Sequence, residues 1–266
     1  PHYLMTAISL AQDRDIELSN NYRAEDFRKL NLFELTPRSI APDNGQAFPT
    51  DPWTYSLFLV PAWWIGGVSG VRIFTILLTG LLAVSLYRIS IRAIHGRETE
   101  AAVATLVICN SPPVLYYGCQ VFPEIAITLF FCLSMEALLF RRPLGFPYYL
   151  HLGFFSGMLM LMHTRGVIIA AGIYLTATLK HRRRPPVITR HLIALLSIAA
   201  AFILLSFGFA GLHGLPNLST RTIVAVDVNS VIQAVGLIFD RESGLFSLAP
   251  LYFLIGVTGI WTTGKN

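Results

Sequence analysis

The stretch VRIFTILLTGLLAVSLYRISI, residues 71–91, decides the fold class of this chain. A helix needs about 20 mostly apolar residues to cross the hydrocarbon core of a bilayer, and this stretch has that length and character. The whole chain of 266 residues is 54% hydrophobic and only 13% charged, whereas a soluble globular domain carries about 25% charged residues. The sequence therefore predicts a membrane protein and argues against a soluble enzyme or a disordered chain.

Further apolar stretches lie on the C-terminal side of this one. They occupy residues 100–118, 121–140, 189–211 and 244–262. The apolar region 146–180 is too long for one span, and His163, Thr164 and Arg165 interrupt its middle. Two short helices that turn at 163–165 fit it better, so we expect an all-α, polytopic transmembrane bundle with about seven spans.

The basic residues indicate which way the bundle faces. Of the 20 Lys and Arg residues, 11 lie in every second loop, and these are Arg88, Arg92, Arg97, Arg141, Arg142, Lys180, Arg182, Arg183, Arg184, Arg190 and Lys265. Because cytoplasmic loops carry an excess of Lys and Arg, we place these loops in the cytoplasm. The same bias accounts for the net charge of +5, so we expect no nucleic-acid partner.

The predicted outer face begins with a long loop, residues 1–70, ahead of the transmembrane domain 71–266. Residues 3–11 show the apolar spacing of a helix, which we expect to lie in the membrane interface. Residues 13–51 are polar and predict an irregular soluble loop. Residues 53–70 are rich in Trp and Tyr, which collect at the headgroup level, and this favours a short interfacial or re-entrant helix leading into the first span.

Burying an ionisable side chain at membrane depth costs free energy unless it is paired, so such residues are functional candidates. On the predicted outer face they are Glu124, His163, Arg165, Asp240 and Arg241. Each also has a structural interpretation. Glu124 follows Pro123 and suits the first turn of a helix. For His163 a structural role is as consistent with the sequence as a functional one. The same holds for Asp240 and Arg241, which would then form a salt bridge at the membrane interface.

Two other groups receive structural interpretations only. Glu136 falls near the cytoplasmic end of its span, and we expect its side chain to extend towards Arg141. Cys109, Cys119 and Cys132 show no metal-ligand spacing and lie in or beside apolar runs, so we expect them to act as small buried hydrophobic residues.

Several motifs, taken in order, resemble one family. They are Pro1-His2-Tyr3-Leu4, the run DRDIELSNNY at residues 13–22, Phe122-Pro123-Glu124, His163-Thr164-Arg165, and FDRESGL at residues 239–245 followed by Ala249-Pro250. Together they resemble the bacterial GT-C fold glycosyltransferases, polytopic enzymes related to protein O-mannosyltransferases and aminoarabinose transferases.

The resemblance implies a transferase that takes a sugar from a polyprenyl-phosphate donor. The acceptor would be a lipid, a glycan or a protein on the periplasmic or extracellular face of a bacterial inner or plasma membrane. In this family an Asp-Glu pair directly precedes the Pro-His-Tyr motif. The chain is therefore expected to be truncated at both ends and to lack the main catalytic acid.

The resemblance also implies residue roles. Glu124 is the catalytic candidate within the chain, as a carboxylate for the acceptor hydroxyl. The implied substrate-binding residues are His2, His163, Arg165, Asp240 and Arg241, of which the two arginines would stabilise the charge that develops on the lipid phosphate. Relatives differ in their need for a divalent metal, so we assign no metal ligand and leave the cofactor open.

Two other function classes remain open. A flippase or transporter of a lipid-linked intermediate would need polar groups along a path across the membrane, and the cytoplasmic halves of the spans are apolar. A non-catalytic membrane scaffold would lack the acidic pair before Pro1, so the residues upstream of Pro1 discriminate it from the enzyme.

Overall fold

The computed structural model describes residues 1–37, 39–40, 47–51, 53–140, 146–162 and 165–181. The predicted spans at 189–211 and 244–262 lie outside these residues. The described part of the chain is mostly helical, and its strands β1 (Ser39–Ile40) and β2 (Phe48–Pro49) form one short antiparallel pair. The all-α prediction is therefore confirmed at the level of fold class.

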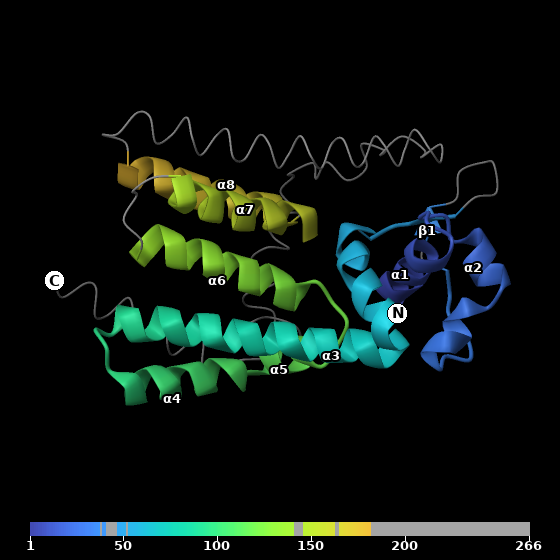
Figure 1. The fold of residues 1–266 in the computed structure, drawn as a ribbon, viewed down its shortest axis with the longest axis horizontal. Helices are drawn as coiled ribbons and strands as arrows, with labels where there is room; N and C mark the ends of the chain where they lie inside the picture. The colour runs from blue at the N-terminus through green and yellow to red at the C-terminus, as the bar shows by residue number, and fades with distance from the viewer. Residues whose placement is uncertain (38, 41–46, 52, 141–145, 163–164, 182–266) are drawn as a thin grey trace, which may run out of the picture.

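The bundle contains α3 (Trp53–Ala93), α4 (Glu98–Cys109), α5 (Pro112–Gly118), α6 (Glu124–Phe140), α7 (Phe146–Met162) and α8 (Arg165–His181). Helix α6 packs between α3 and α7, α8 packs on α7, and α4 packs on α3. Figure 1 shows these helices as near-parallel rods that run back and forth between the two ends of the molecule. Helices α4 and α5 together return the chain from one end to the other, so the starts of α3 and α6 lie at the same end.

Within the described residues, α3 is the one helix long and apolar enough to cross a membrane. Helices α6, α7 and α8 have 17 residues each, the lower limit of the usual span length. The prediction of two short helices within residues 146–180 is confirmed, because α7 and α8 pack against each other; His163 and Thr164, which lie between them, are outside the described residues.

The prediction of one continuous span over residues 100–118 is wrong. Helix α4 ends at Cys109 and α5 begins at Pro112, with Asn110 and Ser111 between them. Pro112 and Pro113 lack backbone N–H donors and cannot extend α4, whereas proline fits the first turn of a new helix. Each piece is shorter than a span.

Helix α3 bends sharply near its start. Gly66 and Gly67 depart from helical geometry, and Gly67 has a φ of 55°, which glycine adopts without a steric penalty. After the bend, Gly70 lies so close to the Ala62 carbonyl that a Cβ atom would clash with it. The bend separates a first segment, 53–65, from the long segment, 68–93, and agrees with the predicted short helix ahead of the first span.

The N-terminal region contains α1 (His2–Gln12), α2 (Ser19–Arg23) and the 3₁₀ helix η1 (Asp26–Leu30). The helix predicted from residues 3–11 is therefore present, but Tyr3 to Leu10 are buried on every side rather than along one face. Its polar members are satisfied locally, since Thr6 donates to the His2 carbonyl at 3.2 Å and Ser9 donates to the Asp15 carboxylate at 2.8 Å. The polar segment 13–51 also contains more helix than an irregular loop would.

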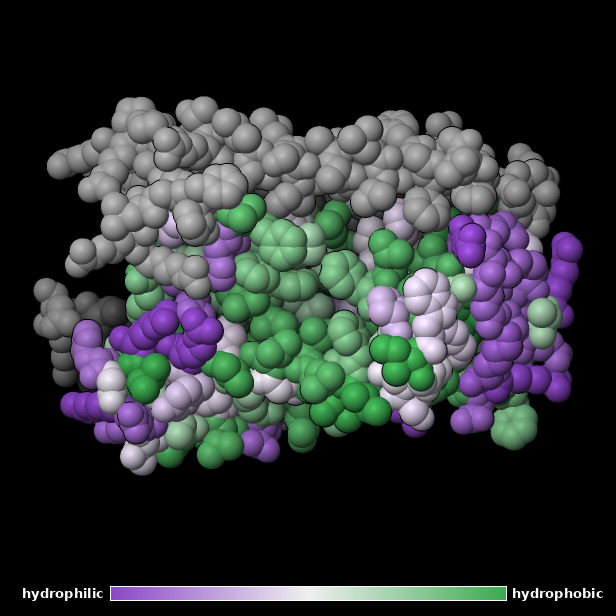
Figure 2. Space-filling model, in the orientation of Figure 1, coloured by the Kyte–Doolittle hydropathy of each residue, from purple (hydrophilic) through white to green (hydrophobic). Residues whose placement is uncertain are grey.

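The surface of the described residues divides into three zones. Figure 2 shows hydrophilic residues gathered at the two ends of the molecule and hydrophobic residues over the middle of the helices. On α3 and α4 this middle zone exposes large side chains, among them Ile76, Leu77, Leu81, Val103 and Leu106. An apolar belt of this kind suits contact with lipid rather than water.

Candidate functional site

Four elements meet at the end of the bundle that carries the N-terminal region. Tyr3 of α1 contacts Tyr55 of α3 edge to face, with ring centroids 5.3 Å apart, and also contacts Phe122, just ahead of α6, at 6.4 Å. The Thr54 hydroxyl donates a hydrogen bond to the Leu161 carbonyl near the end of α7. We call this end of the molecule the outer end, and it brings together segments that are more than 100 residues apart in sequence.

Glu124 is placed at the outer end by the start of α6. The preceding Pro123 accepts the first helical hydrogen bond, from the Ile127 N–H at 2.8 Å, so Glu124 lies in the first turn, as the sequence predicts. The residue is half-buried. Its Oε2 atom is shielded from solvent and accepts no hydrogen bond from the described residues. A buried carboxylate oxygen without a donor is costly, which makes it an acceptor available to another hydroxyl group.

Tyr55 is a neighbour of Glu124 that the sequence analysis did not select. Its side chain is 1% exposed, and the negative charge of Glu124 acts on its hydroxyl. Thr75 lies near the same hydroxyl, and the Thr75 hydroxyl donates its proton to the Val71 carbonyl at 3.1 Å. The Tyr55 hydroxyl has no hydrogen-bond partner of normal geometry among the described residues. Two polar groups with unused hydrogen-bonding capacity thus share the outer end.

The other predicted site residues divide into three groups. His2 begins α1, is half-buried, and lies next to Tyr3 at the outer end. Arg165 is the first residue of α8, and the start of α8 follows the end of α7 closely in sequence. His163, Asp240 and Arg241 lie outside the described residues. The structure therefore brings the elements of His2 and Glu124 together through Tyr3 and Phe122, and places the start of α8 at the same end through Thr54 and Leu161.

A hydrogen-bonded scaffold holds the N-terminal region beside these elements. The Asn21 amide nitrogen donates to carboxylates of Asp13 and Asp26, both at 2.9 Å. Lys29 pairs with Asp26 at 2.6 Å. Within the described part of the chain, no three His, Cys, Asp or Glu side chains are arranged to hold a metal ion. These acids have protein partners and serve to shape the region.

Glu17 fastens the last part of this region. Its carboxylate accepts hydrogen bonds from the backbone N–H of Ser19 at 2.8 Å and of Ala47 at 2.9 Å. Burial by itself raises the pKa of Glu17, but hydrogen bonds from the Ser19 hydroxyl and from the backbone at Ala47, Ser19 and Asn20 outweigh it and lower the pKa below its ordinary value. The ionised form of Glu17 is therefore the one that ties residues 17–20 to residue 47.

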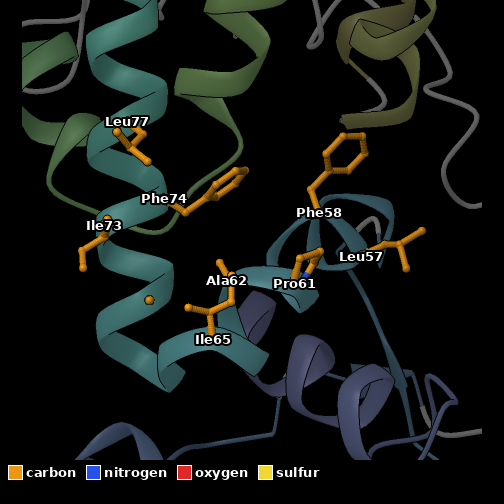
Figure 3. Close-up of a pocket in the computed structure, with 9 residues that line it drawn as sticks. Leu57, Phe58, Pro61, Ala62, Ile65, Ile73, Phe74 and Leu77 are labelled. Atoms are coloured by element: carbon orange, nitrogen blue, oxygen red, sulfur yellow. The ribbon is translucent and has the colours of Figure 1, made fainter.

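An apolar groove opens on the side of the bundle just beyond the bend in α3. It has a volume of about 570 Å³ and lies between the first segment of α3 and the long segment. In Figure 3, Phe58 and Pro61 approach it from the first segment, while Phe74 and Leu77 approach it from the long segment. Its lining is almost wholly apolar, so it suits a hydrocarbon chain and offers no polar group to anchor a soluble ligand.

The opposite end of the bundle holds a buried ion-pair cluster. Glu136 of α6 is 1% exposed, and its Oε1 atom accepts hydrogen bonds from Arg88 and from Arg92 of α3, both at 2.6 Å. The predicted partner of Glu136, Arg141, lies outside the described residues. Among the described residues, both partners of Glu136 come from α3, across the helix interface, and the expected contact with Arg141 stays a prediction.

The three cysteines have different environments. Cys132 is buried and Cys109 is half-buried, but Cys119 is exposed in the turn between α5 and α6. The expectation of small buried residues is therefore confirmed for Cys132 and wrong for Cys119, which lies open to solvent.

No protein-family model matches this chain, and neither a curated protein nor a solved structure shows significant similarity to it.

Proposed function

We propose that this chain is part of a polytopic membrane glycosyltransferase of the GT-C type, which moves a sugar from a polyprenyl-phosphate donor to a lipid, glycan or protein acceptor. The carrying observation is Glu124, whose Oε2 atom is buried at the outer end without a hydrogen-bond donor among the described residues. A carboxylate in this state is suited to accept the proton of an acceptor hydroxyl.

The arrangement of the helices supports a multi-pass topology in this proposal. Helix α3 runs from the outer end to the opposite end, α4 and α5 together return the chain, and α6, α7 and α8 then follow in alternating directions (Figure 1), within the apolar middle of the molecule (Figure 2). Arg88, Arg92 and Arg97 lie at the end opposite Glu124. Under the positive-inside rule the outer end then faces the periplasm or the extracellular space, where lipid-linked sugar donors meet their acceptors.

The apolar groove supports the choice of a lipid-linked donor. It lies between the outer end and the apolar belt, and Leu57, Phe58 and Ile65 expose their side chains around it. A polyprenyl chain has no polar atoms, so an apolar groove of about 570 Å³ suits one section of such a chain. The phosphate would then lie nearer the outer end, where the resemblance assigns Arg165 and Arg241 to its charge.

The test uses the full-length natural protein in membranes, supplied with labelled polyprenyl-phosphate sugars. We expect label transfer by the unchanged protein, and a decrease of about 100-fold or more for Glu124→Gln and for Arg241→Ala, in line with the contribution of acid–base and charge-stabilising groups. Glu98→Gln is the matched control, because Glu98 is exposed in the first turn of α4 at the other end.

Two results would contradict the proposal. Equal transfer by Glu124→Gln and by the unchanged protein would leave Glu124 as a helix-start acid, worth about 0.3–1 kcal/mol of stability through the helix dipole. Movement of the labelled donor across the membrane without transfer of its sugar would instead favour a flippase.

A further inference from the structure

The cluster of Arg88, Arg92 and Glu136 lies where a helix face changes from apolar to basic. On the long segment of α3, Leu77, Leu81, Val84 and Arg88 follow one another at spacings of four, three and four residues, which places them on one face of the helix. The three apolar members are 61%, 56% and 56% exposed. We call Leu77, Leu81 and Val84 the apolar stripe.

Glu136 positions the two arginines at the end of the stripe but occupies only part of their N–H donors. Glu136 fixes one nitrogen of each guanidinium with its Oε1 atom, and the arginine side chains remain 46% and 41% exposed. No second partner for either guanidinium is present among the described residues. Two positive charges against one carboxylate leave an excess of one positive charge at the edge of the apolar belt.

We propose that the apolar stripe and the two arginines bind one anionic glycerophospholipid of the cytoplasmic leaflet. Its phosphate would contact the free N–H groups of Arg88 and Arg92, and one acyl chain would lie along the stripe. Guanidinium groups match phosphate oxygens in pairs, and ordering by Glu136 removes much of the side-chain entropy that binding would otherwise cost. This inference rests on the membrane insertion of α3 within the proposed function, but not on sugar transfer.

The dimensions agree with one leaflet. From Arg88 to Leu77 the helix advances 11 residues, or about 16 Å at 1.5 Å per residue, close to half of a hydrocarbon core about 30 Å thick. A chain that starts at the arginines therefore reaches the middle of the bilayer at Leu77. The site meets the groove at Leu77, which belongs to both, and the groove continues from there towards the outer end.

Native mass spectrometry of the detergent-purified full-length protein tests the proposal, with phosphatidylglycerol and phosphatidylcholine of identical acyl chains as probes. Removing both arginines alone would leave Glu136 unpaired and risk misfolding, so the reference is Glu136→Gln, which keeps both arginines. We expect this reference and the unchanged protein to retain phosphatidylglycerol preferentially. The triple variant with Arg88→Gln and Arg92→Gln should bind it more weakly, by about fivefold for each arginine lost.

Two further arms separate the site from general attraction to negative charge. Arg72→Gln removes an exposed arginine from the other end of the same helix segment and should leave phosphatidylglycerol binding unchanged. Leu81→Ser with Val84→Ser should weaken binding although every charge remains. Equal retention of the two lipids by the unchanged protein, undiminished binding by the triple variant, or an equal loss with Arg72→Gln would each overturn the proposal, and none of these results depends on transferase activity.

Discussion

The ring of Tyr3 meets the ring of Tyr55 edge to face at a centroid distance of 5.3 Å and an interplanar angle of 88°. This contact joins the first turn of α1 to the first turn of α3, and both side chains are buried. Edge-to-face aromatic pairs add to the energy of burial itself. The contact therefore sets the position of the element that carries His2 relative to the helix beside Glu124.

Tyr55 should respond very differently to the loss of its hydroxyl and to the loss of its ring. We expect Tyr55→Phe to leave the free energy of unfolding unchanged or higher, because the buried hydroxyl has no well-formed hydrogen bond among the described residues. Tyr55→Ala should lower it by about 3–5 kcal/mol, as for other large aromatic truncations. Thermal unfolding in detergent measures both, and a larger loss for Tyr55→Phe than for Tyr55→Ala would contradict the environment described.

The ion-pair cluster predicts a non-additive set of variants. Arg88→Ala combined with Arg92→Ala should destabilise the protein by about 3–5 kcal/mol, because it strands a carboxylate that is 1% exposed. Adding Glu136→Gln should recover part of the loss by removing the stranded charge. The check is a thermodynamic cycle of melting temperatures, with Arg72→Ala as the control, and additive losses would show that the three residues do not act together.

Alanine substitutions of the glycines in α3 test whether this helix is bent. Gly70→Ala should destabilise the protein, since the new methyl group would meet the Ala62 carbonyl, and Gly67→Ala should cost about 1–2 kcal/mol because its φ is positive. Gly80→Ala is the matched control. Gly80 lies in the regular part of the helix with open space around it, so alanine there should stabilise by about 0.5–1 kcal/mol. Equal effects at all three positions would argue against the bend.

The hydrogen bonds of Glu17 predict that the local stability around residues 17–20 and 47 depends on pH. Its pKa is lowered in the folded protein, so the stability it contributes is fully present above the unfolded-state value of about 4.5 and is lost as the pH falls through the lower folded value. Hydrogen exchange of the Ser19 and Ala47 amides, corrected for the intrinsic rate, should therefore show lost protection in acid. Glu17→Gln should show weakened protection at neutral pH and no such acid transition.

Cys119 provides a native probe of topology. With Cys109 and Cys132 replaced by serine, a membrane-impermeant maleimide should label Cys119 in intact cells, because it is exposed near the outer end. In a protein without native cysteines, Thr99→Cys should be labelled only after the cells are permeabilised, since Thr99 is exposed at the arginine-rich end. Labelling of both positions from the same side would contradict the proposed alternation of the helices.

Features that depend on neighbouring residues in the sequence were predictable. Apolar run length located α3 and α6, and the polar triplet at 163–165 located the break between α7 and α8. The break between α4 and α5 was equally open to prediction, because Ser111-Pro112-Pro113 is a strong signal for the end of a helix. Apolar run length alone does not register this signal, because residues 100–118 are apolar on both sides of the proline pair.

Features that depend on which helices pack together were not predictable from this one sequence. Glu136 finds its partners 44 and 48 residues away, and no local spacing reports that α6 packs on α3. The sequence marks Tyr55 only as one of the Trp and Tyr residues in 53–70, because its closeness to Glu124 arises from the packing of α1, α3 and α6. The predicted site elements of His2 and Glu124 do lie at one end, whereas the roles assigned to them remain predictions.

The hydrogen bond from Thr54 to the Leu161 carbonyl also sets an order for biosynthesis. Its donor leaves the ribosome 107 residues before its acceptor, so the outer end cannot close while α4 to α6 are being made. During that interval the Thr54 hydroxyl lacks this acceptor, and α1 with the first segment of α3 forms a unit without its contact to α7. Completion of α7 is thus the event that converts this unit into the finished outer end.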